Sequence, residues 1–439
     1  MKATPIDRQI VDEKIQASGL SSIGRSSIRE IRTLINEIEQ ASGKKFIRME
    51  MGIPGLPAAQ IGIDAEKKAL DQGCASFYPS IEGIPELKVE ISRLIKLFID
   101  LDVNPRGCIP CTGSTSGSFI SWLVVGRMNP EKDTVLFLDP GFPVHKQQLN
   151  GLGIKHSSLD VYNYRGEALR AKLEEILREG NISAILYSNP NNPTWICFTD
   201  TELQIIGELA TKYDVVVMED LAYFTMDFRK DYSVPGTPPF QPSVGKYTDN
   251  YILLISSSKA FSYAGQRIGM VAISDALFTR EIPGLTRFYT QKTFGRAMVY
   301  GAAYSVSAGV THSAQYGLTA LLKATNDATY RFIDEVKVYG ERARIMKKYF
   351  LDNGFHIVYD KDEDQPIADG FYFTVAYPGM DGVQLIEELL YYGISAISLA
   401  NTGSERIEGI RACVSLVSES QLPELEQRLQ VFHENHPLQ

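Results

Sequence analysis

The stretch YILLISSSKAFSYAGQRIG, residues 251–269, places a lysine and an arginine just after a run of apolar residues. The run at 251–256 is almost wholly apolar, which is typical of a strand covered on both faces. Lys259 follows that strand before a turn at Gly265, and Arg267 comes eight residues after the lysine. Burial lowers the pKa of a lysine and gives an amine that can form a Schiff base, and an arginine can hold a phosphate. The stretch therefore predicts a covalent site for an aldehyde cofactor that carries a phosphate.

Apolar, β-branched runs of the same kind recur through the middle of the chain. They predict buried strands at residues 134–139, 184–188, 215–220, 252–256 and 268–274. Helical stretches separate several of these runs, and the one over 199–213 opens with the capping box Thr199-x-x-Glu202. Further helices are predicted at 27–41, 86–99, 334–352 and 383–392. Because strands and helices alternate, we expect an α/β fold with a mostly parallel, doubly wound sheet.

Polar and aromatic side chains follow the carboxyl ends of these predicted strands. Phe142 comes after the strand at 134–139, and the sequence NPNNP, residues 189–193, comes after the strand at 184–188. Asp220 ends the third strand, and Tyr223 follows it. In open α/β sheets, ligands bind outside the carboxyl ends of the strands. We therefore expect a ring, an amide, a carboxylate, a phenol and the lysine to converge on one crevice.

Composition and charge narrow the classes of partner. The 439 residues carry a net charge of −9, which argues against nucleic acid as the main partner. No apolar run approaches the roughly 18 residues that suggest a membrane span. The first residues, MKATPIDRQIVDEK, lack the apolar core of a secretory signal and the bias of a transit peptide. We therefore expect no membrane partner and a cytoplasmic location.

The five cysteines are scattered through the sequence. Cys108 and Cys111 form a lone C-x-x-C pair, without the second pair of ligands that structural zinc requires. We expect no metal site and thiols that stay reduced.

Three segments together carry a resemblance to a known family. NPNNPT, DLAY and SSSKAFSYAGQRIG, in this order and spacing, resemble the class I/II aminotransferases, the fold-type-I enzymes that depend on pyridoxal 5'-phosphate. The likeness extends from about residue 46 to about residue 420. It implies a large cofactor-binding domain over 60–310. It also implies a smaller α+β domain built from 1–59 and 311–439.

The resemblance also implies roles around the cofactor ring. Lys259 matches the lysine that holds the cofactor and later moves a proton at the substrate's α-carbon. Asp220 matches the carboxylate that pairs with the pyridine nitrogen, which makes the ring an electron sink. The other ring contacts match by position: Tyr223 and Asn192 for the phenolic oxygen, Phe142 for stacking, and His145 for support of Asp220.

The phosphate contacts and the subunit arrangement follow from the same resemblance. The family's phosphate contacts match Gly113, Ser114, Thr115, Ser256 and Arg267. Backbone N–H groups at a helix start are a natural anion site, and a helix is expected to begin at that first turn. Tyr78 matches a tyrosine that reaches the phosphate from the other subunit, which implies a homodimer with shared active sites.

For the substrate, the candidate residues are Arg411, Gly52 and Asn192. Arg411 stands among apolar neighbours in GIRACVSLV, where an unpaired arginine would be costly. A guanidinium that grips an α-carboxylate with two hydrogen bonds explains its presence there. Gly52 resembles the family's backbone contact near the same carboxylate.

Two positions depart from the family pattern. Trp195 stands where the family usually has a glycine, and glycine permits backbone angles that tryptophan resists. The loop is therefore expected to be reshaped, and the indole could narrow the substrate entrance. Arg296 lies near the place of a side-chain-binding arginine of acid-specific members, but its register does not match closely. We therefore do not predict a dicarboxylate substrate from it.

The predicted reaction is the ping-pong transfer of an amino group from an amino acid to a 2-oxo acid. A carbon–sulfur β-lyase or a decarboxylase on the same fold is the alternative, because one electron sink serves all of these reactions. Ser256-x-x-Lys259 also fits the S-x-x-K signature of serine acyl enzymes, but the S-D-N and K-T-G elements are missing. A non-catalytic binding module is disfavoured by the retention of Lys259.

Overall fold

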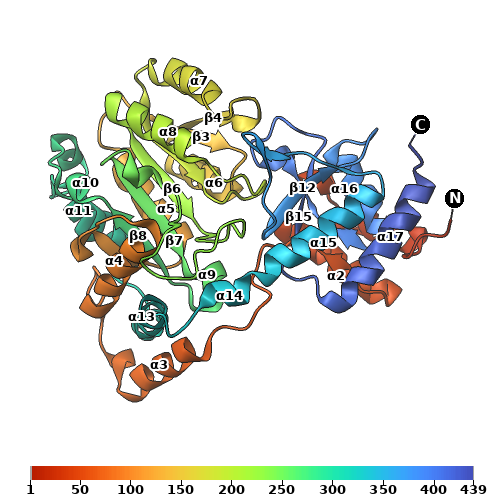
Figure 1. Cartoon of the computed structure of the whole chain (residues 1–439), viewed down its shortest axis with the longest axis horizontal. Coiled ribbons are helices and arrows are strands. Elements are labelled where there is room, and N and C mark those ends of the chain that lie inside the picture. Colours follow the sequence, from red (N-terminus) through yellow and green to blue (C-terminus); the bar gives the residue numbers. More distant parts are fainter. Residues whose placement is uncertain (1, 439) are drawn as a thin grey trace. The chain divides into compact units, whose positions relative to one another are not determined.

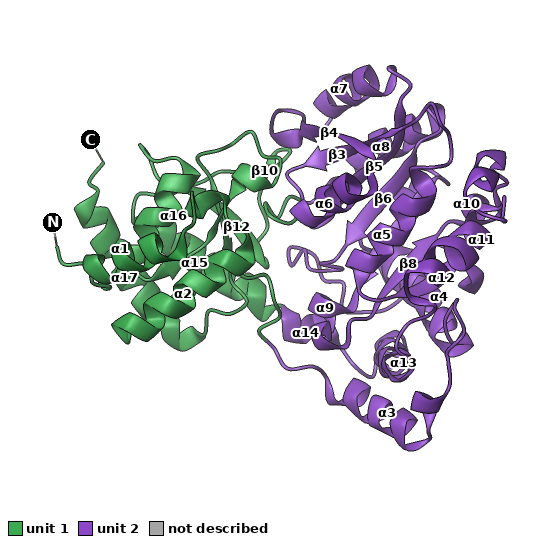
Figure 2. Cartoon of the chain, turned by 180° about the vertical axis from the view of Figure 1, so that it is seen from behind, with its two compact units in different colours: residues 1–55, 192–196, 337–439 green, residues 56–191, 197–336 purple. Residues whose placement is uncertain are grey.

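The computed structural model describes residues 2–438, which form two compact units (Figure 2). The larger unit comprises residues 56–191 and 197–336. The smaller unit takes the remaining described residues, including the short segment Asn192–Ile196. Each unit has its own sheet and its own helices (Figure 1).

The larger unit is built on a seven-stranded sheet. The strand order is β2-β8-β7-β6-β5-β3-β4. The strands are β2 (Cys108–Cys111), β3 (Thr134–Asp139), β4 (Lys155–Asp160), β5 (Ile182–Ser188), β6 (Val216–Leu221), β7 (Tyr251–Ser256) and β8 (Gly269–Ile273). Pairs from β4 through β7 are parallel, and β8 runs antiparallel to both β7 and β2. The mostly parallel sheet confirms the predicted α/β class, and five strands lie where the apolar runs predict them.

Helices surround this sheet. They are α3 (Gln60–Asp71), α4 (Pro85–Ile99), α5 (Ser114–Val125), α6 (Pro143–Leu152), α7 (Ala168–Leu177), α8 (Asp200–Lys212), α9 (Ser257–Ala260), α10 (Asp275–Thr279), α11 (Phe294–Arg296), α12 (Tyr304–Ser307), α13 (His312–Asn326) and α14 (Phe332–Val336). Residues Ala297–Ala303 form a π-helix between α11 and α12. The predicted capping box opens α8, since Thr199 and Glu202 exchange side-chain to backbone hydrogen bonds. The main core joins the sheet to α5 and the π-helix through Trp122, Val124 and Met298.

The smaller unit combines helices with a four-stranded antiparallel sheet. The strand order is β14-β15-β12-β9. Its strands are β9 (His356–Ile357), β12 (Tyr372–Ala376), β14 (Ile397–Ser398) and β15 (Ile410–Cys413), beside the parallel pair β1 (Ile47–Arg48) and β13 (Ile394–Ser395) and the hairpin β10 (Lys361–Asp362) and β11 (Gln365–Pro366). Its helices are α1 (Arg8–Ser18), α2 (Ile28–Ser42), α15 (Val338–Asp352), α16 (Gly382–Tyr391) and α17 (Leu422–Asn435).

Two details differ from the sequence-based expectations. The continuous helix expected over 334–352 is divided into α14 and α15. The larger unit also extends to residue 336 rather than 310, because α13 packs against α3 and α4. The approach of α13 to α3 is close: a Cβ on Gly62 would lie 2.9 Å from Leu321.

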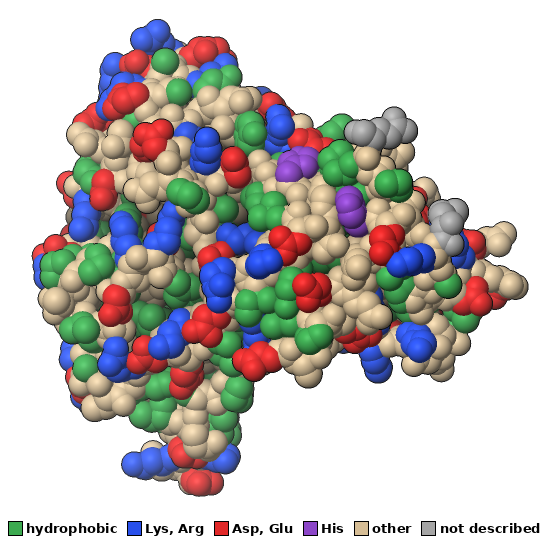
Figure 3. Space-filling view, turned by 45° about the vertical axis from the view of Figure 1, so that its right-hand side comes forward, with side chains coloured by type: hydrophobic (Ala, Val, Ile, Leu, Met, Phe, Trp, Pro, Cys, Tyr) green, Lys and Arg blue, Asp and Glu red, His purple; other side chains and the backbone are tan. Residues whose placement is uncertain are grey.

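The surface and the helix lengths bear on the partner classes. Acidic and basic side chains are mixed on the face drawn in Figure 3, without a large patch of one sign. Among residues 2–438, none of the helices has both the length and the apolar composition that crossing a bilayer requires.

Candidate active site

Lys259 lies in α9, the short helix that directly follows β7 (Figure 1). Ser256 caps this helix, since its Oγ accepts a hydrogen bond from Ser258 N at 3.1 Å. The chain then bends back, and Ser257 Oγ donates to the carbonyl of Ile268, the residue just before β8. These local bonds hold the segment rigidly between the two strands, so that the lysine is fixed at the carboxyl end of a central strand.

Asp220 lies near the end of β6 and is 6% exposed. Its Oδ2 is 3.2 Å from Nε2 of His145, and its Oδ1 accepts a hydrogen bond from Ala222 N at 3.1 Å. His145 belongs to α6 and is 3% exposed, and its other ring nitrogen, Nδ1, has no hydrogen-bond partner among residues 2–438. The structure therefore brings together the carboxylate and the histidine that the resemblance pairs.

Aromatic rings surround this histidine. Phe142, the N-cap residue of α6, contacts the His145 ring edge-on with centroids 5.6 Å apart. Trp122 of α5 contacts the same ring at 6.5 Å. Tyr223 follows β6 and is buried. The rings of Phe142 and Trp122 thus pack edge-on against the imidazole, whose Nε2 lies toward Asp220.

At the start of α5, Gly113 lies next to the guanidinium of Arg267. Gly113 precedes this helix with a φ of +75°, a conformation that favours glycine. A Cβ on Gly113 would lie 2.3 Å from an Nη atom of Arg267, so the glycine allows the guanidinium its close approach. Ser114 and Thr115 begin the helix, where free backbone N–H groups attract anions. A helix start and a guanidinium therefore meet at one point, as a phosphate requires.

Two predicted positions are exposed. Tyr78 is 94% exposed, and it lies beside Phe77, which is 71% exposed. Arg296 is also on the surface, where its Nε donates to Gln291 and its guanidinium lies 5.3 Å from the ring centroid of Tyr300. These contacts account for Arg296 as a surface residue.

In the smaller unit, Arg411 of β15 is 2% exposed. Its two Nη atoms donate to Asn192 Oδ1 at 3.2 Å and to the backbone carbonyl of Glu50 at 2.5 Å. The guanidinium carbon lies 4.4 Å from the ring centroid of Tyr372. Within residues 2–438, Arg411 forms no ion pair with a carboxylate, and its Nε has no hydrogen-bond partner. In the described chain, no carboxylate therefore lies within ion-pair distance of this buried cation.

Gly52 and Trp195 complete the surroundings of Tyr372. A Cβ on Gly52 would lie 1.8 Å from the Tyr372 hydroxyl oxygen, which explains the glycine. Trp195 is fully buried, with its ring edge-on to Tyr372 at 6.2 Å. Its φ is +68°, a conformation that costs a non-glycine residue about 1–2 kcal/mol. Burial of the indole contributes about 4–6 kcal/mol and offsets that cost.

Sequence reasoning missed Tyr372 and Gly370. Both lie in GFYFTVA, residues 370–376, most of which forms β12, but nothing in the sequence links this segment to Arg411 or Trp195. The register of the sheet supplies the link, because Tyr372 and Arg411 lie on the adjacent strands β12 and β15.

The cysteines belong neither to the residues described around Asp220 nor to those described around Arg411. All five are buried free thiols, and burial raises the pKa of Cys108 and of Cys111 to about 12. Among residues 2–438, no group of three or more His, Cys, Asp or Glu side chains is arranged to hold a metal ion.

Comparison with known proteins identifies the family. The sequence matches the family described as aminotransferase class I and II over residues 47–429, which is most of the chain. The chain belongs to this family. It is an enzyme, an aminotransferase, as the three motifs predict.

Relatives of this aminotransferase agree with the assignment. A probable aspartate aminotransferase of Methanocaldococcus jannaschii is 27% identical over 353 residues, 79% of this chain and 85% of the relative. An LL-diaminopimelate aminotransferase of Natranaerobius thermophilus is 26% identical over 356 residues, 80% of this chain and 82% of the relative. The solved alanine aminotransferase from Pyrococcus furiosus has a TM-score of 0.75 at 20% identity, over 95% of this chain and 99% of that one. The predicted fold of this aminotransferase is therefore confirmed.

Proposed function

We propose that this aminotransferase holds pyridoxal 5'-phosphate in its larger unit and binds the α-carboxylate of its substrates through Arg411 of its smaller unit. The observation that carries the proposal is the buried Arg411 guanidinium without a carboxylate partner. An arginine cannot release its proton, so a buried one requires an anion. Amino acids and 2-oxo acids share one group that fits, the planar carboxylate.

The larger unit's residues fit the cofactor at both ends. Gly113 and the first residues of α5 form a cradle beside Arg267 that suits a phosphate. At the other end, Asp220 is buried and oriented by His145, which suits a protonated ring nitrogen. We assign the remaining cofactor contacts of this unit to Ser114, Thr115, Phe142, Tyr223 and Ser256, and a further cofactor contact to Asn192, which belongs to the smaller unit.

Each residue would have a separate task in the transfer. When bound, the cofactor supplies an electron-withdrawing ring that stabilises negative charge at the substrate's α-carbon. Lys259 would hold the cofactor's aldehyde carbon and carry a proton on Nζ to and from the α-carbon. Asp220 would keep a proton at the ring nitrogen, and His145 fixes the direction of its carboxylate. Tyr223 would donate a hydrogen bond to the ring's phenolic oxygen.

Arg411 would act in both halves of a ping-pong reaction. An amino acid binds through its carboxylate, gives up its amine and leaves as a 2-oxo acid. A second 2-oxo acid then binds to the same guanidinium and leaves as an amino acid. Gly52 and Asn192 would complete the carboxylate site, Gly52 through its backbone and Asn192 through the amide that already contacts Arg411.

We also propose that two copies of the chain form a homodimer. The exposed aromatic side chains of Phe77, Tyr78 and Tyr304 support this, since aromatic residues are enriched at protein–protein interfaces. Tyr78 would then contact the phosphate of the partner subunit. Light scattering during size-exclusion chromatography should give twice the mass of one chain, and a monomer that retains full activity would contradict the proposal. The cytoplasmic location stays a prediction, which cell fractionation checks.

A single assay tests the proposed reaction. The purified enzyme with pyridoxal 5'-phosphate is mixed with 2-oxoglutarate and one amino acid at a time, beginning with those for which the relatives are named: aspartate, LL-diaminopimelate and alanine. We expect one glutamate for each 2-oxo acid formed from the amino acid. Release of ammonia or carbon dioxide in place of glutamate would mean a lyase or a decarboxylase and would overturn the proposal.

A further inference from the structure

We propose that Trp195 is a positioning residue for Arg411 and that it acts through the ring of Tyr372. The proposal rests on the proposed function, in which Arg411 binds the substrate carboxylate. It concerns the position at which this chain departs from the family's usual glycine, and it assigns that departure a task in substrate binding.

The first observation is the fit between Trp195 and Gly370. The indole is fully buried although its backbone has a φ of +68°. A Cβ on Gly370 would lie 1.9 Å from the indole ring, so any other residue there would displace the tryptophan. Position 195 carries a tryptophan where the family usually has a glycine. Gly370, which has no side chain, leaves the space that the indole fills.

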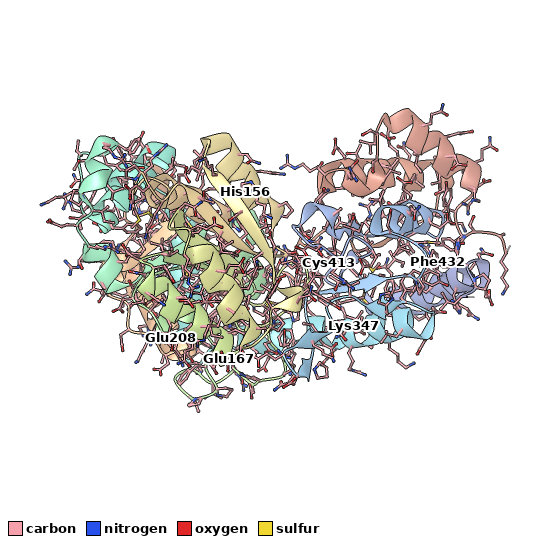
Figure 4. All side chains as sticks on the ribbon, turned by 90° about the horizontal axis from the view of Figure 1, so that it is seen from above. His156, Glu167, Glu208, Lys347, Cys413 and Phe432 are labelled. Carbon is pink, nitrogen blue, oxygen red and sulfur yellow. The ribbon has the colours of Figure 1, made fainter. Side chains whose placement is uncertain are left out.

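The second observation is that the segment around Gly370 is anchored. Lys347 of α15 pairs with Asp369 at 2.5 Å and donates to the carbonyl of Ala368 at 3.4 Å. Figure 4 labels Lys347 on its helix in the smaller unit. Because its neighbours are tied to α15, Gly370 cannot shift to relieve pressure on the indole. Gly370 therefore confines the indole of Trp195 on one side.

The third observation is a chain of contacts that runs from Trp195 through Tyr372 to Arg411. Tyr372 is 1% exposed, with its hydroxyl against Gly52, its ring edge-on to Trp195, and its face 4.4 Å from the Arg411 guanidinium carbon. The tyrosine is therefore confined at its hydroxyl by Gly52 and along its ring by Trp195. Without the indole, the ring could tilt toward the vacated space.

The orientation of Tyr372 matters because a guanidinium stacks flat on an aromatic ring. The plane of the ring thus sets the plane of the guanidinium, and a carboxylate must lie in that plane to accept two hydrogen bonds. Trp195 does not need to touch the substrate to have this effect. It keeps the arginine in the orientation in which both hydrogen bonds can form.

The test is steady-state kinetics of the holoenzyme with 2-oxoglutarate and whichever of L-aspartate, L-alanine and L-tyrosine the wild type converts fastest. Trp195→Gly suits the left-handed backbone but removes the indole. We expect the KM values for the amino acid and for 2-oxoglutarate to rise together by about tenfold or more, with kcat within about twofold, since carboxylate binding is weakened throughout the reaction. Trp195→Phe, which keeps a ring, should raise both values by only about threefold.

Gly370→Ala gives an independent second variant. Its methyl group would push the indole away, so alone it should raise both KM values about as much as Trp195→Gly does. Added to Trp195→Gly, it should have no further effect, because the space is then empty. As a matched control, Tyr391→Leu removes the ring from another arginine–tyrosine stack of the smaller unit, that of Arg8, and should leave both KM values unchanged.

The outcomes separate this proposal from the proposed function. If Arg411→Lys raises both KM values but neither Trp195→Gly nor Gly370→Ala does, the positioning role is wrong and the carboxylate role stands. If Arg411→Lys leaves both unchanged, the carboxylate role fails and the positioning role fails with it. A fall in kcat alone, or additive effects of the two substitutions, would also overturn the positioning role. Circular dichroism checks that each variant folds. If Trp195→Gly does not fold, the KM values of the single variants Trp195→Phe and Gly370→Ala decide whether the positioning role is correct.

Discussion

Buried ionisable side chains at the carboxyl end of β6 in the larger unit differ from the buried Arg411 of the smaller unit in how their charge is compensated. In the larger unit, Asp220 has hydrogen bonds to both carboxylate oxygens, one of them with the ring of His145. On the same strand, the fully buried Glu219 has no ion-pair partner among residues 2–438, and burial raises its pKa to about 7. In the smaller unit, Arg411 is buried without a carboxylate partner in the described chain.

The difference lies in which charge can be removed by protonation. Glu219 can avoid a buried charge because it can keep its proton. Arg411 cannot, because a guanidinium stays charged at any ordinary pH. A carbonyl, an amide and an aromatic ring stabilise it in part, but none of them brings a full negative charge. We therefore propose that Arg411 takes up an external anion, whereas Asp220 has its hydrogen-bond partners within the larger unit.

The largest effect is expected from Lys259→Ala in the larger unit. Loss of the amine removes both the covalent hold on the cofactor and the group that moves the proton, so kcat should fall by about 10⁴-fold or more. Stopped-flow and steady-state assays of transamination measure the fall. The exposed Lys246, replaced by alanine in the same unit, is the control and should leave kcat unchanged. If the kcat of Lys259→Ala stays within about tenfold of the wild-type value, Lys259 is not the catalytic lysine of the larger unit.

Asp220→Asn should have the next largest effect. The amide keeps the shape but not the negative charge that holds a proton at the ring nitrogen, so kcat should fall by about 10³-fold. Asp220→Glu keeps the charge and should recover part of the loss. A fall of less than about tenfold in the asparagine variant would mean that Asp220 is only a structural residue.

Arg411→Lys tests the smaller unit. A lysine keeps the charge but cannot form two parallel hydrogen bonds with a carboxylate, so the KM for both substrates should rise by about 10²-fold. Thermal unfolding adds a second readout. Saturating 2-oxoglutarate should raise the Tm of the wild type more than that of the variant. Equal rises in Tm would contradict the claim that Arg411 binds the carboxylate.

The smallest effect on activity is expected from Glu219→Gln, which tests stability instead. The folded-state pKa of Glu219, about 7, lies above its ordinary value of 4.5. Its contribution to stability is therefore fully present below pH 4.5 and is lost as pH rises through about 7. The wild type should lose up to about 3 kcal/mol relative to the glutamine variant between pH 5 and pH 8.

Urea unfolding at several pH values measures this difference. Glu208 is a matched control, an exposed glutamate on α8 (Figure 4) that accepts a hydrogen bond from Arg170. Its hydrogen bond with Arg170 lowers its pKa, so Glu208→Gln should change the stability slightly and with the opposite dependence on pH. A parallel pH dependence of Glu219→Gln and wild type would show that Glu219 is ionised in the folded protein.

Much of the fold could be predicted from local sequence patterns. The strands β3, β5, β6, β7 and β8 are continuous apolar runs, and the capping boxes at Ser27 and Thr199 mark the starts of two helices. Strand β4 was missed because KHSSLD lies at the edge of the sheet and is half exposed. β2 was missed because Pro110 interrupts a four-residue strand. Short edge strands depend on pairing with a neighbour, which local patterns do not contain.

The candidate site divides in the same way. The contact between Asp220 and His145 follows from motifs that parallel strands place at one edge of a sheet. The stack of Trp195, Tyr372 and Arg411 could not be predicted, because its members come from separate segments whose register is set by tertiary packing. Sequence does indicate that Trp195 replaces a glycine, but only the structure reveals that Gly370 makes room for it.

The most direct test of the central claim is to find which lysine holds the cofactor. The holoenzyme with pyridoxal 5'-phosphate is reduced with borohydride, digested and mapped by mass spectrometry. We predict that the cofactor's added mass appears on the peptide containing Lys259 and that it disappears from the digest of Lys259→Ala. Labelling of a different lysine, or no labelling of the wild type, would contradict the account.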